Sequence, residues 1–209
     1  MRFAPYHLSN PDELRSAVVF ASPHSGSDYT ADFLTQSLLN EKTIRSSEDA
    51  FVDLLFDAVP DFGSPLLKAA APRAFVDLNR SADELDPALI SGARRHGYNP
   101  RVASGLGVIP RVVANGRAIY SGKISMAEAT HRLDAFWRPY HAALQQLLDN
   151  AHAHFGQAIL IDCHSMPHEA IDGVAKSSGK RPEIVLGDRF GAAAAVSYTH
   201  LTLPTIYSV

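Results

Sequence analysis

Two histidines each follow a short apolar run that ends in a turn. His24 comes after the run 18–22, and His164 comes after the run 158–162. Such short runs, bounded by Pro, Gly or Ser, are typical of buried parallel strands, and parallel sheets bind ligands beyond the carboxyl ends of their strands. Two imidazoles and one carboxylate are a common protein ligand set for catalytic zinc, which keeps a fourth position for water. The sequence therefore predicts a metal site and a hydrolase.

The carboxylate of this site has more than one candidate. A helix is predicted over 46–59, with Glu48 and Asp49 both in its first turn. The helix dipole favours any carboxylate at that place, with or without a metal. Adjacent helical residues point about 100° apart, so only one of the two can face the histidines. Asp53, one turn later, is a further alternative.

The predicted elements alternate between helices and strands, which indicates an α/β domain. A hairpin turn is expected at Asn115-Gly116, and Pro139 is expected to kink the longest helix. The helices are predicted over 31–40, 46–59 and 125–154, the strands over 18–22, 65–68, 74–78, 108–114 and 158–162, and a loop-rich stretch over 81–107. The histidines of the longest helix, among them His141, are expected to face solvent.

Composition excludes several classes of partner. The chain has 209 residues, 46% of them hydrophobic, and a net charge of -3, so no basic face for nucleic acid is expected. No window approaches the ~20 apolar residues of a membrane helix, and the first residues lack the apolar run of a secretory signal. We therefore expect a cytoplasmic protein that binds neither membranes nor nucleic acid. The single cysteine, Cys163, is expected to be a buried thiol.

Five short motifs occur in a fixed order between residues 18 and 191. They are PHSG at 23–26, SEDAFVD at 47–53, VDLNR at 76–80, GLGVI at 105–109 and DCHSMP at 162–167. Together they resemble the N-formylglutamate amidohydrolases. The resemblance implies a three-layer α/β fold, with a mixed, mainly parallel sheet between helices, similar to the zinc carboxypeptidases. It also implies a small-molecule substrate, N-formyl-L-glutamate, which is hydrolysed to formate and L-glutamate in histidine breakdown.

For the metal, the resemblance implies Zn²⁺ held by His24, Asp49 and His164, and it favours Asp49 over Glu48. Zinc at that place would polarise the formyl carbonyl and lower the pKa of water. In similar enzymes the general base is a glutamate of a distal segment that has no counterpart in this chain. No catalytic base is therefore assigned here.

Three residues beside the ligands are expected to support them: Ser25, Gly26 and Asp162. Asp162, two residues before His164, could orient that imidazole through its second ring nitrogen. Gly26 could allow the backbone to approach the metal or the substrate closely.

Substrate binding is assigned to Asn79, Arg80 and Arg111. An amide and a planar guanidinium suit a carboxylate such as the α-carboxylate of the substrate. The alternative for Arg80 is a surface ion pair with Asp83 or Glu84.

Two further activities stay open at this stage: a related zinc acyl-amino-acid amidase such as a desuccinylase, or a non-catalytic fragment that binds zinc or an amino acid. The last residues also differ from the rest, since Asp, Glu, Lys and Arg are absent from 192–209. We expect a partial domain over 1–195, incomplete at its C-terminus, followed by a tail over 196–209 that is not part of the fold. The sequence makes no prediction about oligomeric state.

Overall fold

The computed structural model describes residues 4–94, 97–171 and 183–187. The chain divides into two compact units, residues 1–165 and residues 166–209. In the second unit the described residues include one short 3₁₀ helix, η5 (His168–Ile171). The predicted tail over 196–209 and its boundary lie outside the described residues. All elements named below belong to the first unit.

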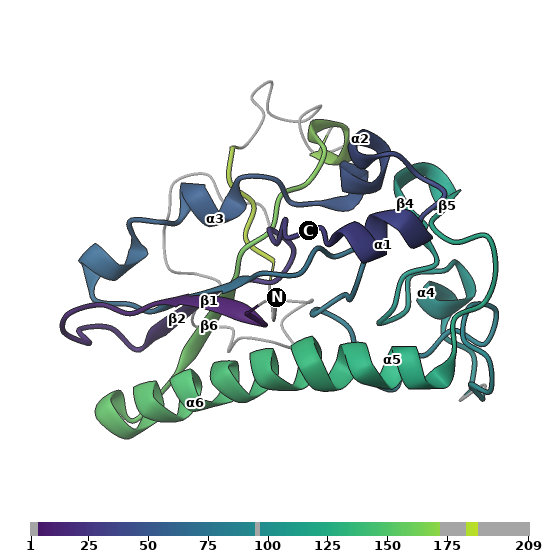
Figure 1. The fold of residues 1–209 in the computed structure, drawn as a ribbon. Helices are drawn as coiled ribbons and strands as arrows, with labels where there is room; N and C mark the ends of the chain where they lie inside the picture. The colour runs from purple at the N-terminus through teal and green to yellow at the C-terminus, as the bar shows by residue number, and fades with distance from the viewer. Residues whose placement is uncertain (1–3, 95–96, 172–182, 188–209) are drawn as a thin grey trace. The chain divides into compact units, whose positions relative to one another are not determined.

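A four-stranded sheet forms the centre of the first unit (Figure 1). Its strands lie in the order β1 (Tyr6–Ser9), β3 (Leu66–Ala69), β2 (Val18–Ser22) and β6 (Ile159–Asp162). Strand β2 is parallel to both neighbours, whereas β1 is antiparallel to β3. The predicted mixed, mainly parallel sheet is therefore confirmed, as are three of its predicted strands.

A second, two-stranded sheet consists of β4 (Val112–Val113) and β5 (Arg117–Ala118). The 3₁₀ turn η3 (Ala114–Gly116) joins them, with Asn115 at φ 61° and Gly116 at φ 70°. These left-handed conformations are the ones that an Asn-Gly pair adopts most readily, so the predicted turn is confirmed. The predicted strand over 108–114 is shorter than expected.

The longest predicted helix is present as one continuous rod. It comprises α5 (Met126–Arg132), the π-turn η4 (Leu133–Trp137) and α6 (Arg138–Phe155), and Figure 1 shows it running along the sheet. Ser125 caps its start by accepting a hydrogen bond from the Glu128 amide, and Gly156 at φ 70° ends it. The expected kink at Pro139 is wrong. The wider π-turn before the proline, in which the Arg138 amide bonds to Leu133 O, accommodates the ring instead.

The predicted helix over 46–59 is wrong. The chain forms the 3₁₀ turn η1 (Arg45–Ser47), the short helix α3 (Val52–Leu55) and the 3₁₀ turn η2 (Val59–Phe62). Glu48 is extended, and the Asp49 amide donates to His24 O at 3.0 Å, which ties this stretch to the sheet. Phe51 then reverses the chain in a left-handed conformation. Phe51, Leu54 and Leu55, whose apolar spacing suggested a helix, are exposed in this arrangement.

The stretch 74–78, predicted as a strand, belongs to a run of turns that we call the 73–80 segment. The Phe75 and Val76 amides bond to Pro72 O, and the Asp77 amide bonds to Val108 O at 2.8 Å. The segment is therefore held by isolated bonds. The predicted loop-rich stretch 81–107 is confirmed, with one short helix, α4 (Pro100–Ala103).

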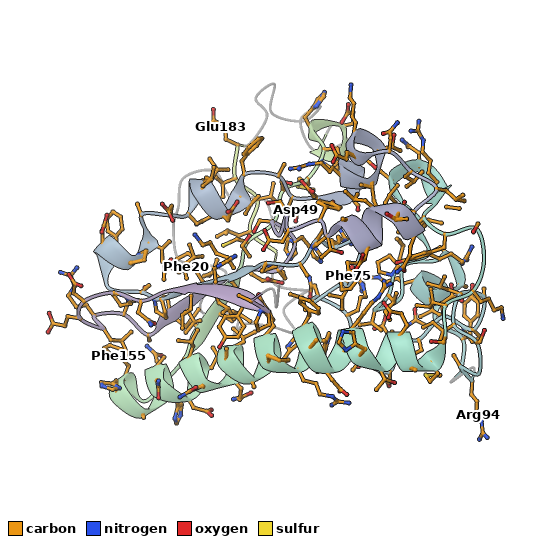
Figure 2. The ribbon with its side chains drawn as sticks, in the orientation of Figure 1. Phe20, Asp49, Phe75, Arg94, Phe155 and Glu183 are labelled. Atoms are coloured by element: carbon orange, nitrogen blue, oxygen red, sulfur yellow. The ribbon has the colours of Figure 1, made fainter. Side chains whose placement is uncertain are left out.

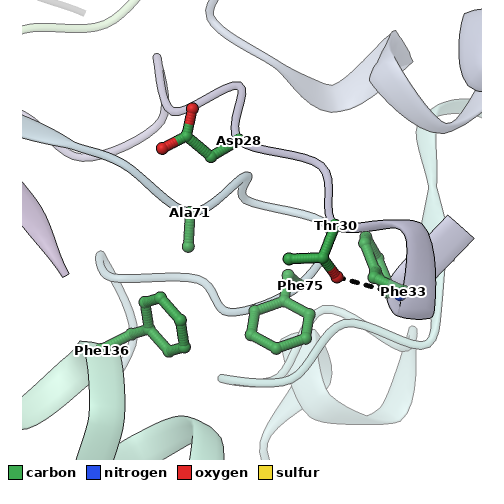
Figure 3. A pocket seen from close by; sticks show the side chains of 6 residues that line it. All are labelled: Asp28, Thr30, Phe33, Ala71, Phe75 and Phe136. Atoms are coloured by element: carbon green, nitrogen blue, oxygen red, sulfur yellow. Dashed lines mark hydrogen bonds between the residues drawn. The ribbon is translucent and has the colours of Figure 1, made fainter. Parts of the chain in front are cut away.

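Two further helices are α1 (Ala31–Gln36), which is shorter than the helix predicted over 31–40, and α2 (Glu41–Ile44), which begins after it. Thr30 caps α1 by accepting from the Phe33 amide, as Figure 3 shows. Phe33 and Phe136 both pack against Phe75, around a cavity with room for about one water molecule. Buried apolar side chains of β3, the 73–80 segment, the loop that follows it and the long helix form the main core. No helix in the described ranges is long and apolar enough to cross a membrane.

Candidate metal centre

The sheet brings the two histidines together. Strands β2 and β6 are parallel neighbours, with Ala21 opposite Asp162. Each histidine lies two residues beyond the end of its strand, so His24 and His164 emerge side by side at the same edge of the sheet. Their ring centroids are 4.7 Å apart.

Asp49 completes the cluster. Its Oδ2 lies 2.8 Å from His164 Nδ1 and 3.5 Å from His24 Nδ1, and Ser165 Oγ donates to its Oδ1 at 3.1 Å. One ligand atom from each of the three residues lies within 4.8 Å of the others. The structure thus brings together the three residues that the sequence suggested as metal ligands (Figure 2 labels Asp49).

One nitrogen of this cluster has no hydrogen-bond partner in the described part of the chain. His24 Nδ1 is buried and faces Asp49 without forming a hydrogen bond. A buried imidazole nitrogen without a partner is costly in a protein interior. A metal ion bound between His24, Asp49 and His164 would satisfy it, so the donor set fits a cation such as zinc.

A carboxylate binds the other ring nitrogen of each histidine. His24 Nε2 lies 2.7 Å from Asp77 Oδ1, and His164 Nε2 lies 3.0 Å from Asp162 Oδ2. If each Nε2 carries the proton and donates it, each Nδ1 presents a lone pair to the cluster; this tautomer is assigned from the hydrogen-bond network. Such carboxylate–histidine pairs fix the orientation of metal-binding imidazoles.

Asp77 was not singled out from the sequence. Its side chain is almost fully buried, at 2% exposure. It accepts hydrogen bonds from the backbone amide of Asn79 at 2.9 Å and from Arg73 Nε at 3.0 Å. Burial opposes its ionisation, but the bond from His24 and the charge of Arg73 outweigh it and lower the pKa of Asp77. Arg73 was also not predicted, because a separation of four residues from Asp77 indicates a contact only if the chain turns between them.

The central ionisable groups have shifted pKa values. Burial disfavours the charged form of Asp49, yet the hydrogen bond from His164 and the nearby imidazole of His24 lower its pKa well below the usual range. Burial alone would lower the pKa of His164, but the bonds to Asp162 and Asp49 raise it to about 9. In the absence of a metal, His164 is therefore an imidazolium held between two carboxylates.

Glu48 faces away from the histidines. Its carboxylate is buried and lies 3.1 Å from Arg45 Nη2. Its neighbour Asp49 is the one that turns to the cluster, because the extended backbone at Glu48 points adjacent side chains in opposite directions. Asp53 lies in α3, and among the described residues no hydrogen bond or ion pair joins it to the cluster.

Ser25 and Gly26 shape the turn after β2. Ser25 Oγ accepts from Ser22 Oγ at 2.8 Å, which closes the turn that presents His24. A Cβ at Gly26 would collide with the backbone carbonyl of Ala71. The close approach that this structure shows is therefore to the chain that follows β3, and an approach of Gly26 to a metal or substrate stays a prediction.

The residues assigned to substrate binding separate into two groups. The side-chain amide nitrogen of Asn79, Nδ2, lies 3.1 Å from His164 Nε2, and Arg80 Nε lies 3.9 Å from Asp77 Oδ2. Both residues therefore border the cluster. The Arg80 guanidinium is 13% exposed, and its Nε forms no hydrogen bond in the described structure. Arg111 instead donates to Asp86 at 2.9 Å and to Ala103 O at 3.4 Å, which holds the 81–107 loop.

For two residues near the site the sequence predicted the extent of burial, correctly for Cys163 and wrongly for His141. Cys163 is buried, as expected, and burial raises the pKa of its thiol to about 12. His141 was expected to face solvent, but it is half-buried, packs against Trp137 with ring centroids 4.0 Å apart and donates to Leu78 O.

Comparisons with solved structures place this geometry among known folds. A crystal structure of N-formylglutamate amidohydrolase from Ralstonia eutropha superimposes with a TM-score of 0.82 and 34% identity, over 94% of this chain and 71% of that one. A gene product of Agrobacterium tumefaciens, at 14% identity and a TM-score of 0.58, covers 89% of this chain and 63% of its own, and shares the fold alone.

Sequence comparisons agree with the structural ones. An N-formylglutamate deformylase of Pseudomonas putida is 28% identical over 185 residues, which are 86% of this chain and 61% of the relative. One from Pseudomonas aeruginosa is 29% identical over 207 residues, 90% of this chain and 70% of the relative. The chain thus spans about three fifths of the length of the Pseudomonas putida protein. The profile of the N-formylglutamate amidohydrolases matches residues 16–206, and the chain belongs to this family.

Proposed function

We propose that this chain carries the metal-binding part of an amidohydrolase that converts N-formyl-L-glutamate into formate and L-glutamate. The observation that carries the proposal is the convergence of His24, Asp49 and His164 at the carboxyl edge of the sheet. Relatives with the same family profile are named N-formylglutamate deformylases. Histidine breakdown as the pathway, the cytoplasm as the location and a zinc carboxypeptidase-like fold remain predictions.

Zn²⁺ is the metal that suits these donors best. Two imidazole nitrogens and one carboxylate oxygen are a common ligand set of catalytic zinc, whereas Ca²⁺ and Mg²⁺ prefer oxygen ligands. His24 Nδ1, Asp49 Oδ2 and His164 Nδ1 would hold it. Bound there, zinc would polarise the formyl carbonyl and make water a better nucleophile.

The residues around the cluster have separate tasks in this proposal. Asp77 and Asp162 keep the imidazoles in the orientation and tautomer that the metal needs. Arg80 would bind a carboxylate of the substrate through its planar guanidinium, and Asn79 would orient that carboxylate with its amide. Because Arg80 and Asn79 border the histidines, a small acyl group attached to the bound amino acid would lie at the metal.

Zinc binding and hydrolysis are tested on the purified chain. We expect one zinc ion per chain by atomic absorption, lost in Asp49→Ala and His164→Ala. Glu48→Gln is the matched control, since Glu48 pairs with Arg45, and it should keep its zinc. Absence of zinc from the unaltered chain would overturn the proposal.

Substrate choice is tested by product analysis with N-formyl-L-glutamate and N-succinyl-L-glutamate. Formate release from the first compound alone supports the proposed reaction, and succinate release would favour a desuccinylase. Zinc and glutamate binding without hydrolysis of either compound would favour a non-catalytic fragment. Loss of a positioned general base typically costs 100- to 10,000-fold in rate, so the assay must detect turnover that is slower by this factor.

A further inference from the structure

The backbone of the 73–80 segment is held by side chains of the long helix. The segment contains no strand, so its carbonyl groups lack the regular partners that a sheet would supply. Side chains of the helix donate to three of these carbonyls. The pairs are Arg132 Nη1 with Phe75 O at 3.2 Å, His141 Nε2 with Leu78 O at 2.9 Å and Trp137 Nε1 with Arg80 O at 2.9 Å.

These hydrogen bonds flank the two residues of the segment that contact the histidines of the metal cluster. Between the three carbonyls lie Asp77, which binds His24, and Asn79, which contacts His164. A shift of the segment would move both side chains away from their imidazoles. The three donors therefore act on the cluster through the backbone of the 73–80 segment, although none of them touches a proposed ligand in the described structure.

The π-turn in the helix sets the spacing of the donors. Arg132 and Trp137 are five residues apart, and five residues span one hydrogen-bonded turn of a π-helix. In a regular α-helix the same separation corresponds to a rotation of about 140°. The π-turn thus brings Arg132 and Trp137 to the same side of the helix. His141 follows one α-helical turn later and packs against Trp137, with the two rings tilted by 35°.

Each donor is itself fixed. Arg132 is fully buried, bonds to Glu128 at 2.7 Å and to Tyr120 at 2.6 Å, and lies over the ring of Phe75 at 4.1 Å from its centroid. Figure 3 shows Phe75 near Phe136 of the π-turn, on the side of the segment that faces the helix. Donors that cannot move to other rotamers hold their acceptors in one place.

We propose that Arg132, Trp137 and His141 are positioning residues, which fix the 73–80 segment so that Asp77 orients His24 and Asn79 stays beside His164 in the metal centre. The link to zinc rests on the proposed function. The control of the segment by the helix does not, and it can be measured without a metal.

The metal-free test is amide hydrogen exchange of the 73–80 segment, followed by mass spectrometry. His141→Leu and Trp137→Phe each remove one donor, and exchange of this segment should accelerate about five- to tenfold, the equivalent of one hydrogen bond. Arg15→Met is the matched control, because it removes a side-chain bond to Asp61 O in a different loop. Exchange that stays at the unaltered rate in both variants would overturn the proposal.

The second test is zinc affinity, measured by competition with a chromogenic chelator. His141→Leu should weaken zinc binding about five- to tenfold. His141→Gln should stay within about twofold of the unaltered chain, because its side-chain amide can still donate to Leu78 O. Equal losses in both His141 variants, or no loss in either, would overturn the proposal.

The two tests separate two kinds of failure. An unaltered chain that binds no zinc contradicts the proposed function, while hydrogen exchange still decides whether the helix holds the segment. An unaltered chain that binds zinc with the same affinity as His141→Leu contradicts the positioning role alone. Circular dichroism of each variant ensures that folded proteins are compared.

Discussion

The exchange Asp77→Asn tests whether a remote carboxylate prepares His24 for the metal. Asp77 Oδ1 accepts hydrogen bonds from His24 Nε2 and from the backbone amide of Asn79, and Asp77 Oδ2 accepts one from Arg73 Nε. An asparagine keeps the shape but replaces one acceptor by an amide donor. If this NH₂ group faces Arg73, two donors oppose each other. If it faces His24, the imidazole must carry its proton on Nδ1, where the metal would bind.

The size of the effect follows from these contacts. Outer partners of metal-binding histidines typically contribute 10- to 100-fold to metal affinity, which corresponds to about 1.4 to 2.7 kcal/mol. Loss of a hydrogen bond to a charged group typically costs about 1.5 to 3 kcal/mol of stability. We therefore expect Asp77→Asn to weaken zinc binding 10- to 100-fold and to lower the free energy of unfolding by about 2 kcal/mol.

The chain contains a matched control for this experiment. Asp86 is also buried, accepts from the amide two residues later and from Arg111 Nε, but meets no histidine. Asp86→Asn should lose similar stability in urea unfolding and keep its zinc affinity in chelator competition. Equal zinc affinities for the Asp77 and Asp86 variants would refute the role of the Asp77–His24 bond.

Three other expectations need only single measurements. Arg80→Lys keeps the charge but loses the planar guanidinium, so the rate of N-formyl-L-glutamate hydrolysis should fall by a factor that corresponds to ~1 to 3 kcal/mol. Zinc content should stay unchanged, and full activity would exclude Arg80 from substrate binding. Phe51 is 70% exposed with φ 67°, and Phe51→Asn should raise the free energy of unfolding by about 1 kcal/mol, where a decrease would contradict the inferred strain. Because burial raises the pKa of Cys163 to about 12, iodoacetamide at pH 8 should alkylate the folded chain on the order of 1,000-fold more slowly than the urea-unfolded chain, and equal rates would contradict a buried thiol.

The part of the site that could be predicted from sequence is the part that local patterns determine. Apolar runs that end in turns identified β2 and β6, and the parallel pairing of these strands then placed His24 beside His164. Asp162 precedes His164 by two residues, and side chains two apart on an extended chain share a face. Its contact with His164 Nε2 thus follows from spacing alone.

The rest depends on contacts between distant parts of the chain. The apolar spacing over 46–59 favoured a helix, but the bond from the Asp49 amide to His24 O competes with helix formation there. The stretch 74–78 was predicted as a strand, yet in the described structure it pairs with no strand, and helix side chains donate to carbonyls of the 73–80 segment instead. Asp77 could not be assigned because its partner lies 53 residues away.

The charges around the cluster lead to a last expectation about the order of binding. The carboxylates are Asp49, Asp77 and Asp162, and the guanidinium groups that border them are Arg73 and Arg80. Because the pKa of His164 is raised to about 9, its imidazole is protonated in the metal-free chain, and with it these five groups carry no net charge. A divalent cation that displaces this proton leaves one net positive charge, so an anionic acyl-amino acid should bind after the metal.

Calorimetry with L-glutamate tests this order. We expect binding to the zinc-loaded chain and at least tenfold weaker binding after treatment with a chelator, since one favourable charge contact in a partly buried site is worth about 1.4 kcal/mol or more. Asp86→Asn again provides the control, because it changes a carboxylate that contacts none of the five groups in the described structure. Equal affinity with and without zinc would mean that the arginines alone outweigh the carboxylates, and that the metal acts on the acyl group without helping to hold the substrate.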